Sequence, residues 1–113
     1  MKISILSDTH GYIDSQIIRH LENSDEIWHA GDVGNTDVVN KIEQLAGKTR
    51  VVYGNIDGQD IRLRFRETAL FEIEGVSILM THIAGKPTNY NKPVRALIQK
   101  YKPNILVCGH SHI

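Results

Sequence analysis

The stretch Ile3-Ser4-Ile5-Leu6-Ser7-Asp8-Thr9-His10-Gly11 sets the pattern for the whole chain. A short apolar run, typical of a β-strand, ends in a turn that contains a carboxylate and an imidazole. Similar fragments follow four later apolar runs: Gly31-Asp32, Gly54-Asn55, His82 and Gly109-His110-Ser111-His112. Loops after parallel strands meet at one edge of an open α/β sheet, so these distant residues are expected to converge there.

Strands and helices are expected to alternate along the chain. The strands are predicted from short apolar runs, over 3–6, 27–28, 51–53 and 105–108, with a hairpin over 70–73 and 76–80 around Glu74-Gly75. Three helices lie between them, and their first turns are marked by Asp14 or Ser15, by Asn35 or Thr36, and by Pro93. Gly47 is expected to end the second helix. This order predicts a single α/β domain with a mostly parallel sheet and one antiparallel hairpin.

The composition excludes several classes of function. The chain has 113 residues, and its 13 Lys and Arg balance its 13 Asp and Glu, so its net charge is zero. Non-specific nucleic-acid binding is not expected, because it relies on a basic excess. No apolar stretch reaches the length of a membrane span or a signal-peptide core, so we expect no membrane association and a cytoplasmic location. The single cysteine, Cys108, is expected to be a small buried hydrophobic residue.

The side chains in the five fragments form a mixed set of metal donors. Two are carboxylates, one is an amide and four are imidazoles: Asp8, Asp32, Asn55, His10, His82, His110 and His112. This mixture suits transition metals such as Mn, Fe, Zn or Ni better than Mg or Ca, which prefer oxygen ligands. Seven donors are enough for two divalent ions, whose excess charge can hold a hydroxide and a phosphate ester. Each fragment alone is more often an ordinary turn. The prediction of a metal site therefore rests on the occurrence of all five fragments in order, each at the end of a strand.

The series Asp8-x-His10, Gly31-Asp32, Gly54-Asn55-x-Asp57, His82 and Gly109-His110-Ser111-His112 resembles the calcineurin-like metallophosphoesterase superfamily. The resemblance covers essentially the whole chain and is closest to small single-domain prokaryotic phosphodiesterases. It implies an α/β fold of two β-sheets packed face to face, with helices outside. It also implies two metal sites, one formed by Asp8, His10, Asp32 and His112 and the other by Asp32, Asn55, His82 and His110, with Asp32 as the bridge.

The activity that the resemblance implies is hydrolysis of a small phosphate ester by metal-bound hydroxide. Asp32, Asn55, His82 and His110 are then the catalytic residues. Ile56 departs from the family pattern, because many members have at this position a histidine that protonates the leaving group. Its replacement by isoleucine favours phosphodiesters over monoesters of alcohols, which need that proton most.

A second departure from the family pattern concerns the end of the chain. Family members usually continue well past the last motif, whereas this sequence stops at Ile113. We therefore expect one domain over residues 1–113 that is incomplete at its C-terminus. An unpaired edge of the second sheet would then favour a homo-oligomer.

Two other interpretations stay open. The superfamily contains a retromer subunit that uses this fold as a protein-binding scaffold without catalysis, although the ligand set here is complete. The chain is also compatible with an inactive fragment that still binds metal. Among the remaining residues, His29 either supports a ligand or simply ends a strand. Arg62, Arg64 and Arg66 alternate with apolar residues and are expected on the solvated face of an extended segment.

Overall fold

The computed structural model of the chain describes residues 2–83, 85–86 and 89–109. The first of two three-stranded sheets is parallel, with the order β1 (Ile3–Leu6), β2 (Glu26–His29) and β3 (Lys48–Val51). The second sheet has the order β4 (Thr68–Ile73), β5 (Val76–Thr81) and β8 (Ile105–Cys108). In it, β4 runs antiparallel to β5 and β8 runs parallel to β5. The short strands β6 (Gly85–Lys86) and β7 (Asn89–Tyr90) pair with each other.

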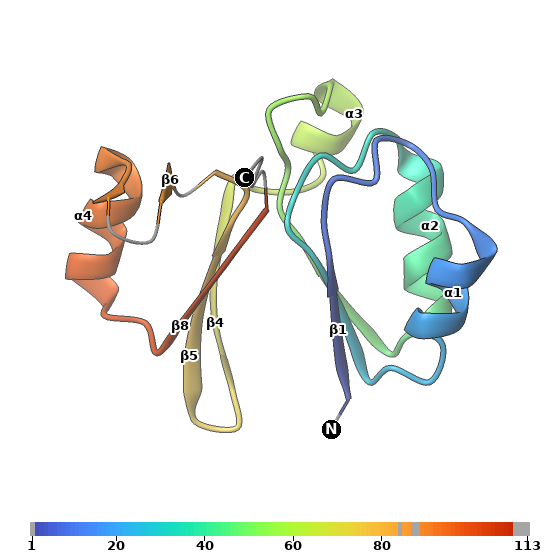
Figure 1. The fold of residues 1–113 in the computed structure, drawn as a ribbon, viewed down its shortest axis with the longest axis horizontal. Coiled ribbons are helices and arrows are strands. Elements are labelled where there is room, and N and C mark those ends of the chain that lie inside the picture. Colours follow the sequence, from blue (N-terminus) through green and yellow to red (C-terminus); the bar gives the residue numbers. More distant parts are fainter. Residues whose placement is uncertain (1, 84, 87–88, 110–113) are drawn as a thin grey trace.

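Helices cover the outer faces of both sheets. They are α1 (Ser15–Leu21), α2 (Thr36–Leu45), α3 (Gln59–Arg62) and α4 (Lys92–Tyr101). Figure 1 shows α1 and α2 outside the first sheet and α4 outside the second, with the two sheets facing each other between them. The two-sheet α/β architecture that the family resemblance implied is therefore confirmed. None of the described helices is long and apolar enough to cross a membrane.

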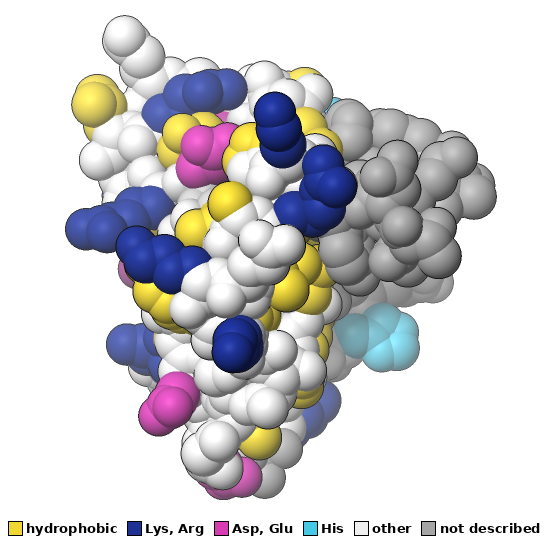
Figure 2. Space-filling model, turned by 90° about the vertical axis from the view of Figure 1, so that its left-hand side faces the viewer, with side chains coloured by type: hydrophobic (Ala, Val, Ile, Leu, Met, Phe, Trp, Pro, Cys, Tyr) yellow, Lys and Arg dark blue, Asp and Glu magenta, His cyan; other side chains and the backbone are white. Residues whose placement is uncertain are grey.

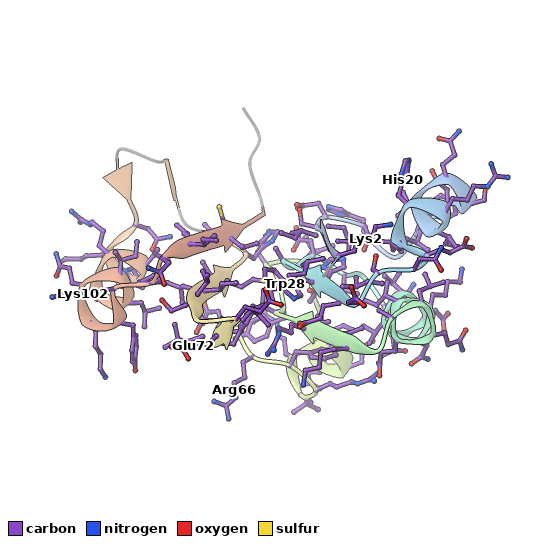
Figure 3. All side chains as sticks on the ribbon, turned by 90° about the horizontal axis from the view of Figure 1, so that it is seen from below. Lys2, His20, Trp28, Arg66, Glu72 and Lys102 are labelled. Atoms are coloured by element: carbon purple, nitrogen blue, oxygen red, sulfur yellow. The ribbon has the colours of Figure 1, made fainter. Side chains whose placement is uncertain are left out.

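The alternation of side chains along β2 builds two cores. This strand is buried at every position, because helices cover one of its faces and the second sheet covers the other. Ile27 points into the core between the first sheet and the helices, which also contains Leu21 and Ile42. Trp28 points into the core between the sheets, and Figure 3 shows it there. Its ring meets the ring of Phe71 edge to face, with 5.0 Å between the centroids.

A buried carboxylate strengthens this contact between the sheets. Glu26 Oε1 accepts hydrogen bonds from Trp28 Nε1 at 3.0 Å and from Arg50 Nε at 2.9 Å. The Arg50 guanidinium also lies over the Phe71 ring, 4.1 Å from its centroid. Because Arg50 belongs to β3 and Phe71 to β4, this group of four side chains fixes how the sheets face each other.

The local signals in the sequence correspond to real caps and turns. Three helices begin after a side chain that accepts a hydrogen bond from a backbone N–H in the first turn: Asp14 from Ile17, Asn35 from Val38 and Asn91 from Val94. The hairpin between β4 and β5 turns on Glu74 (φ 49°) and Gly75 (φ 82°). Two successive positive φ angles are the geometry of a tight two-residue hairpin, as Glu-Gly indicated.

Three local expectations were wrong. The third strand is Lys48–Val51 rather than 51–53, because its pairing with β2 begins in a polar segment. Cys108 is exposed, since β8 is the last strand of its sheet among the described residues. The segment around Arg62 is a short helix and not an extended chain, so the alternation of the three arginines did not reflect a strand. By contrast, α2 ends at Leu45 with Ala46 at its C-cap, so Gly47 lies directly after the helix, as expected.

The outer surface around α4 is basic. Figure 2 views the molecule from this side and shows more Lys and Arg than Asp and Glu side chains. The helix itself contains Lys92, Arg95 and Lys100 and no acidic residue. These three side chains are exposed, so their charges are solvated and do not contribute to either core.

Candidate metal centre

The loops that follow β1 and β2 are held together by backbone hydrogen bonds beyond the ends of the strands. The amide of Asp8 donates to the carbonyl of Gly31 at 2.9 Å, and the amide of His10 donates to the carbonyl of Asp32 at 3.0 Å. The amide of Gly11 continues this pattern to the carbonyl of Val33 at 2.7 Å. The loops therefore run side by side, which brings Asp8, His10 and Asp32 into one place.

These three residues share an unusual backbone conformation. The φ angles of Asp8, His10 and Asp32 are 57°, 52° and 55°, in the left-handed region that non-glycine residues rarely occupy. Such a conformation costs about 1–3 kcal/mol per residue and is most frequent at functional sites. Here it accompanies the convergence of the side chains, because one ligand atom from each residue lies within 4.8 Å of the others.

The Asp32 carboxylate lies at the centre of this group and is almost fully buried. Its Oδ1 accepts a hydrogen bond from the backbone amide of Ile56 at 3.1 Å. Its Oδ2 lies 3.1 Å from Nε2 of His82 and 3.9 Å from Nε2 of His10. One oxygen is thus held by the main chain while the other faces two imidazoles from different sheets, which suits a bridging ligand.

The orientation of the His82 ring is set by a main-chain carbonyl. Nδ1 of this buried histidine lies 2.7 Å from the carbonyl oxygen of Ala30. A carbonyl oxygen can only accept, so Nδ1 carries a proton, and Nε2 is the ring nitrogen that faces Asp32. This is the usual arrangement of a metal-binding histidine, in which the hydrogen bond at one nitrogen fixes the donor at the other.

The Asp8 carboxylate has one oxygen bonded to a neighbouring hydroxyl and the other directed at the centre. Ser7 Oγ donates to Asp8 Oδ2 at 2.6 Å. Asp8 Oδ1 lies 3.7 Å from Nε2 of His82 and 3.9 Å from Nε2 of His10. The chain returns to this point at Gly109, where an added Cβ would lie 3.0 Å from Asp8 Oδ2. The two histidines that follow, His110 and His112, lie outside the described residues.

Two glycines of the motifs are required because other side chains pack directly against their backbone. A Cβ at Gly54 would lie 2.1 Å from Asp32 Oδ1, and a Cβ at Gly31 would lie 2.6 Å from Nδ1 of His82. Gly31 also has a φ of 103°, which other residues rarely adopt. Any side chain at either position would displace the central carboxylate or the histidine, so both glycines serve the geometry of the centre.

Asp57 holds the loops together from behind the centre. Its carboxylate accepts three backbone hydrogen bonds, from Val33 at 3.1 Å, Gly34 at 2.8 Å and Gly54 at 2.8 Å. Its side chain is buried, and its three donors come from two different loops. The sequence matched Asp57 to the family motif but did not show this role, because the donors are main-chain atoms.

His29 is a second buried support that the sequence left undecided. Gly31 N donates to His29 Nδ1 at 3.1 Å, so the proton of the neutral ring is on Nε2 and is donated to Thr9 Oγ1 at 3.0 Å. Thr9 in turn donates to the carbonyl of Val33 at 2.9 Å. Burial lowers the pKa of His29 to about 4, and this outweighs the opposite effects of the carboxylates of Asp57 and Asp8. The neutral ring therefore joins the two loops.

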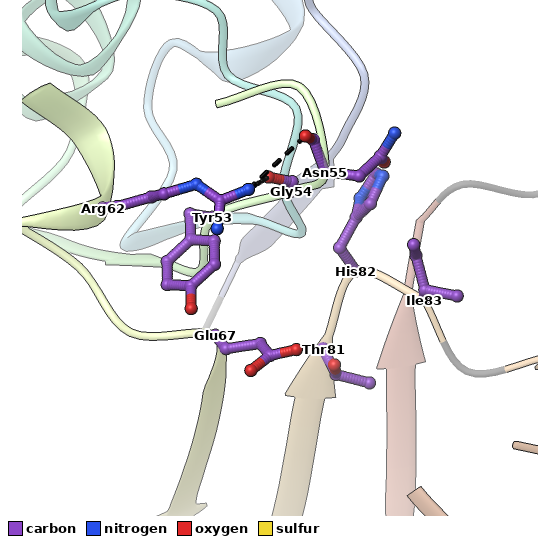
Figure 4. Close-up of a pocket in the computed structure, with 8 residues that line it drawn as sticks. All are labelled: Tyr53, Gly54, Asn55, Arg62, Glu67, Thr81, His82 and Ile83. Carbon is purple, nitrogen blue, oxygen red and sulfur yellow. Dashed lines mark hydrogen bonds between the residues drawn. The ribbon is translucent and has the colours of Figure 1, made fainter. Parts of the chain in front are cut away.

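Asn55 and His82 line a common pocket beside the centre. Figure 4 shows this pocket, which is also lined by Tyr53, Arg62 and Glu67. Five of the seven expected ligands thus lie in the described part of the chain. Four of them converge, Asp8, His10, Asp32 and His82, and Asn55 lies on the adjoining pocket wall.

Comparison with known proteins identifies relatives over almost the whole chain. A probable metallophosphoesterase of Mycoplasma pneumoniae is 34% identical over 119 residues, which cover 99% of this chain and 68% of the relative. A phosphodiesterase of Methanocaldococcus jannaschii is 24% identical over 128 residues, covering 99% of this chain and 74% of that protein.

Solved structures show the same fold. Vps29 from Chaetomium thermophilum superposes with a TM-score of 0.80 at 12% identity, over 98% of this chain and 62% of that chain. The chain thus spans about two thirds of the length of these proteins. The sequence profile described as the calcineurin-like phosphoesterase superfamily domain matches residues 1–113. The resemblance seen in the motifs is therefore confirmed, and the chain belongs to the calcineurin-like phosphoesterase superfamily.

Proposed function

We propose that this chain is a phosphodiesterase that works with two divalent transition-metal ions. The observation that carries the proposal is the position of Asp32 Oδ2, which lies 3.1 Å from His82 and 3.9 Å from His10. A buried carboxylate oxygen that faces imidazoles from two different sheets fits a ligand shared by two ions. The family membership and the relative named as a phosphodiesterase support the same activity.

The donors of the chain fit two such ions. Asp8, His10, Asp32 and His112 would hold one ion, and Asp32, Asn55, His82 and His110 would hold the other. When bound, the ions would lower the pKa of a coordinated water to about 7 and offset the charge of the phosphate group. The mixed nitrogen and oxygen donors favour Mn, Fe, Zn or Ni.

Main-chain groups orient the side chains of this centre before metal or substrate binds. The Ala30 carbonyl fixes the His82 ring, and the Ile56 amide fixes the Asp32 carboxylate. Both side chains are buried, which limits the movement needed before a substrate binds. The backbone bonds between the loops keep Asp8 and His10 beside them.

The same site favours diesters with good leaving groups. Ile56 is 47% exposed beside the centre, and its hydrocarbon side chain has no proton to give to a departing oxygen. An aryl oxide leaves without protonation, whereas an alkoxide does not. The two substrates bis(p-nitrophenyl) phosphate and p-nitrophenyl phosphate share such a leaving group, and the relative named as a phosphodiesterase favours faster hydrolysis of the diester.

The experiment compares these two substrates with Mn, Ni, Zn and Mg, and again after chelation. The wild type should hydrolyse the diester only with metal, and His82→Ala should lose at least tenfold in rate. His20→Ala serves as the matched control, because His20 is an exposed helix residue away from the centre. Absence of metal-dependent turnover, or equal rates in the wild type and His82→Ala, would overturn the proposal.

The second candidate function is a non-catalytic scaffold, which the likeness to Vps29 brings into consideration. That likeness shows the fold alone, and the ligand set of this chain favours the enzyme. A scaffold or an inactive fragment would bind metal with its donors but would turn over neither substrate. The assay above, with metal content measured on the same sample, separates these outcomes.

Self-association is the further part of the proposal. In the described residues β1 and β8 are edge strands, and an apolar groove of about 360 Å³ lies between them. Ile5 and Ile105 on its rim are 54% and 47% exposed. A second copy would cover this surface and pair with the β8 edge. Size-exclusion chromatography should show a dimer that Ile105→Lys converts to monomer; a monomeric wild type at high concentration would contradict this.

A further inference from the structure

The pocket beside the centre has a volume of about 250 Å³ and two chemically different ends. In Figure 4, Arg62, Gly54 and Asn55 lie at one end and Glu67 and Thr81 at the other, with His82 between them. These residues come from α3, from the loop after β3, from the segment before β4 and from the end of β5. The pocket therefore lies beside the candidate metal centre, between segments that belong to the two sheets.

Arg62 forms a fixed wall of this pocket. Its Nε donates to the carbonyl of Asp57 at 2.6 Å, and its Nη2 lies 3.4 Å from the Asn55 carbonyl and 3.5 Å from the Gly54 carbonyl. Its guanidinium also stacks over the ring of Tyr53, 4.6 Å from the centroid. These contacts hold the loop that carries Asn55, so Arg62 contributes a positive charge at this end without being a mobile clamp.

The opposite end of the pocket presents hydrogen-bonding oxygens. Figure 4 shows the Glu67 side chain extending toward Thr81. A carboxylate presents two acceptor oxygens in one plane, and a threonine hydroxyl can both donate and accept. Two neighbouring hydroxyl groups of a ligand match this arrangement, because each can donate to one carboxylate oxygen.

We propose that this pocket binds the ester group that stays on phosphorus, and that this group is a neutral polyol such as glycerol or a sugar. The inference rests on the proposed phosphodiesterase function and names the substrate class of the same site. His82 and Asn55 connect the pocket to the phosphate position, whereas Ile56, beside which the leaving group would depart, is not among the residues that line it.

Charge and size distinguish a polyol from other substituents. Arg62 and Glu67 give the pocket one positive and one negative side chain, so neither a cationic nor an anionic substituent is favoured by net charge. A volume of about 250 Å³ is below the usual range for drug-sized ligands, which favours a small group. The two carboxylate oxygens of Glu67 would accept hydrogen bonds from two hydroxyl groups of the polyol, which is the contact that distinguishes it from an alkyl group.

The test uses three p-nitrophenyl phosphodiesters that differ only in the retained ester group, which is glyceryl, methyl or 2-aminoethyl. Their leaving group is identical, so a difference in kcat/KM for formation of the monoester product reports on the pocket. The cyclic phosphate that the glyceryl hydroxyl can form by displacing p-nitrophenoxide is counted separately. The glyceryl ester should exceed the methyl ester by about tenfold, the value of one hydrogen bond to a charged acceptor. Equal values for the glyceryl and methyl esters, or a preference for the aminoethyl ester, would overturn the inference.

Variants at Glu67 assign the preference to this side chain. Glu67→Ala should reduce the glyceryl-to-methyl ratio to about one, and Glu67→Gln, which keeps one acceptor oxygen, should retain part of it. Glu72→Ala is the matched control, because Glu72 is an exposed glutamate on β4 outside the pocket. A glyceryl preference that survives Glu67→Ala would overturn the assignment.

Product binding gives a readout that does not need turnover. Calorimetric titration of the metal-loaded protein should show glycerol 3-phosphate binding about tenfold more tightly than methyl phosphate, and Glu67→Ala should abolish this difference. If the three diesters are not hydrolysed but the binding difference is present, the proposed activity fails and the polyol pocket stands. If all are hydrolysed at one rate with no binding difference, the activity stands and the pocket inference fails.

Discussion

Nε2 of His82 lies 3.1 Å from Oδ2 of Asp32, and this contact joins the two sheets of the molecule at their loop ends. Asp32 follows β2 of the first sheet, and His82 follows β5 of the second. Each side chain is 3% exposed, so the pair is removed from solvent at the point where the other candidate ligands converge. Its geometry depends on how the sheets pack as well as on the loops.

Asp32→Asn should weaken both metal sites together, because it removes the anion that the two ions would share. We expect a loss of at least about 100-fold in affinity at each site, since even indirect partners of a metal ligand contribute 10–100-fold. His112→Ala should weaken mainly one site. Calorimetric titration with Zn or Mn measures both, and a variant Asp32→Asn that loses only one site would contradict the bridging role.

Ile56→His should raise turnover of diesters with alkyl leaving groups far more than of those with aryl leaving groups. General acid catalysis contributes about 10²–10⁴-fold, and an aryl oxide needs little of it. The measurement is the ratio of kcat on methyl and p-nitrophenyl leaving groups for wild type and variant. An equal change on both would show that the side chain at this position does not act through proton transfer.

Stability of the metal-free protein should fall as the pH drops from about 6.5 to 4, partly through His29. Its pKa is lowered to about 4 in the folded state, so the unfolded chain binds this proton first and protonation favours unfolding. The contribution of neutral His29 to the free energy of unfolding is fully present above pH 6.5. About 3 kcal/mol of it is lost by pH 4. Urea unfolding of His29→Gln should have a shallower pH dependence than wild type, while exposed His20→Gln should not differ from it.

Asp57→Ala should destabilise the fold by about 3 kcal/mol or more. It leaves three backbone N–H groups without their acceptor, two of them buried, and each buried unsatisfied group costs about 1–3 kcal/mol. Asp60→Ala is the matched control, because Asp60 is exposed on α3 and should change stability by less than about 0.5 kcal/mol. Similar urea midpoints for the two variants would show that Asp57 does not hold the loops.

The convergence of Asp8, His10, Asp32 and His82 could be predicted, because each lies at the end of a strand and strand ends share an edge. The roles of Asp57 and His29 could not be predicted, because their partners are main-chain groups of other loops. Nearly every residue type has these main-chain groups, so the residue types do not indicate which of them will be a partner. The left-handed backbone conformation of Asp8 and His10 could not be predicted either, because the pairing of the two loops imposes it.

The errors in the fold have related causes. Lys48–Val51 is a polar edge strand, so it lacks the apolar run by which strands are predicted, and its pairing with β2 defines it. The helix α3 has four residues, too few for helical periodicity to appear. Cys108 looked buried because its neighbours are apolar, but its exposure depends on whether another strand lies beside β8.

We propose that this chain holds two metal ions and that both are needed to hydrolyse a phosphodiester. The most direct measurement is a titration of metal-free protein with Mn or Zn, following bis(p-nitrophenyl) phosphate hydrolysis and bound metal on the same samples. We predict that activity rises until two ions are bound per chain and then stays constant. Full activity at one ion per chain, or two bound ions without hydrolysis, would show that the chain is not a two-metal phosphodiesterase.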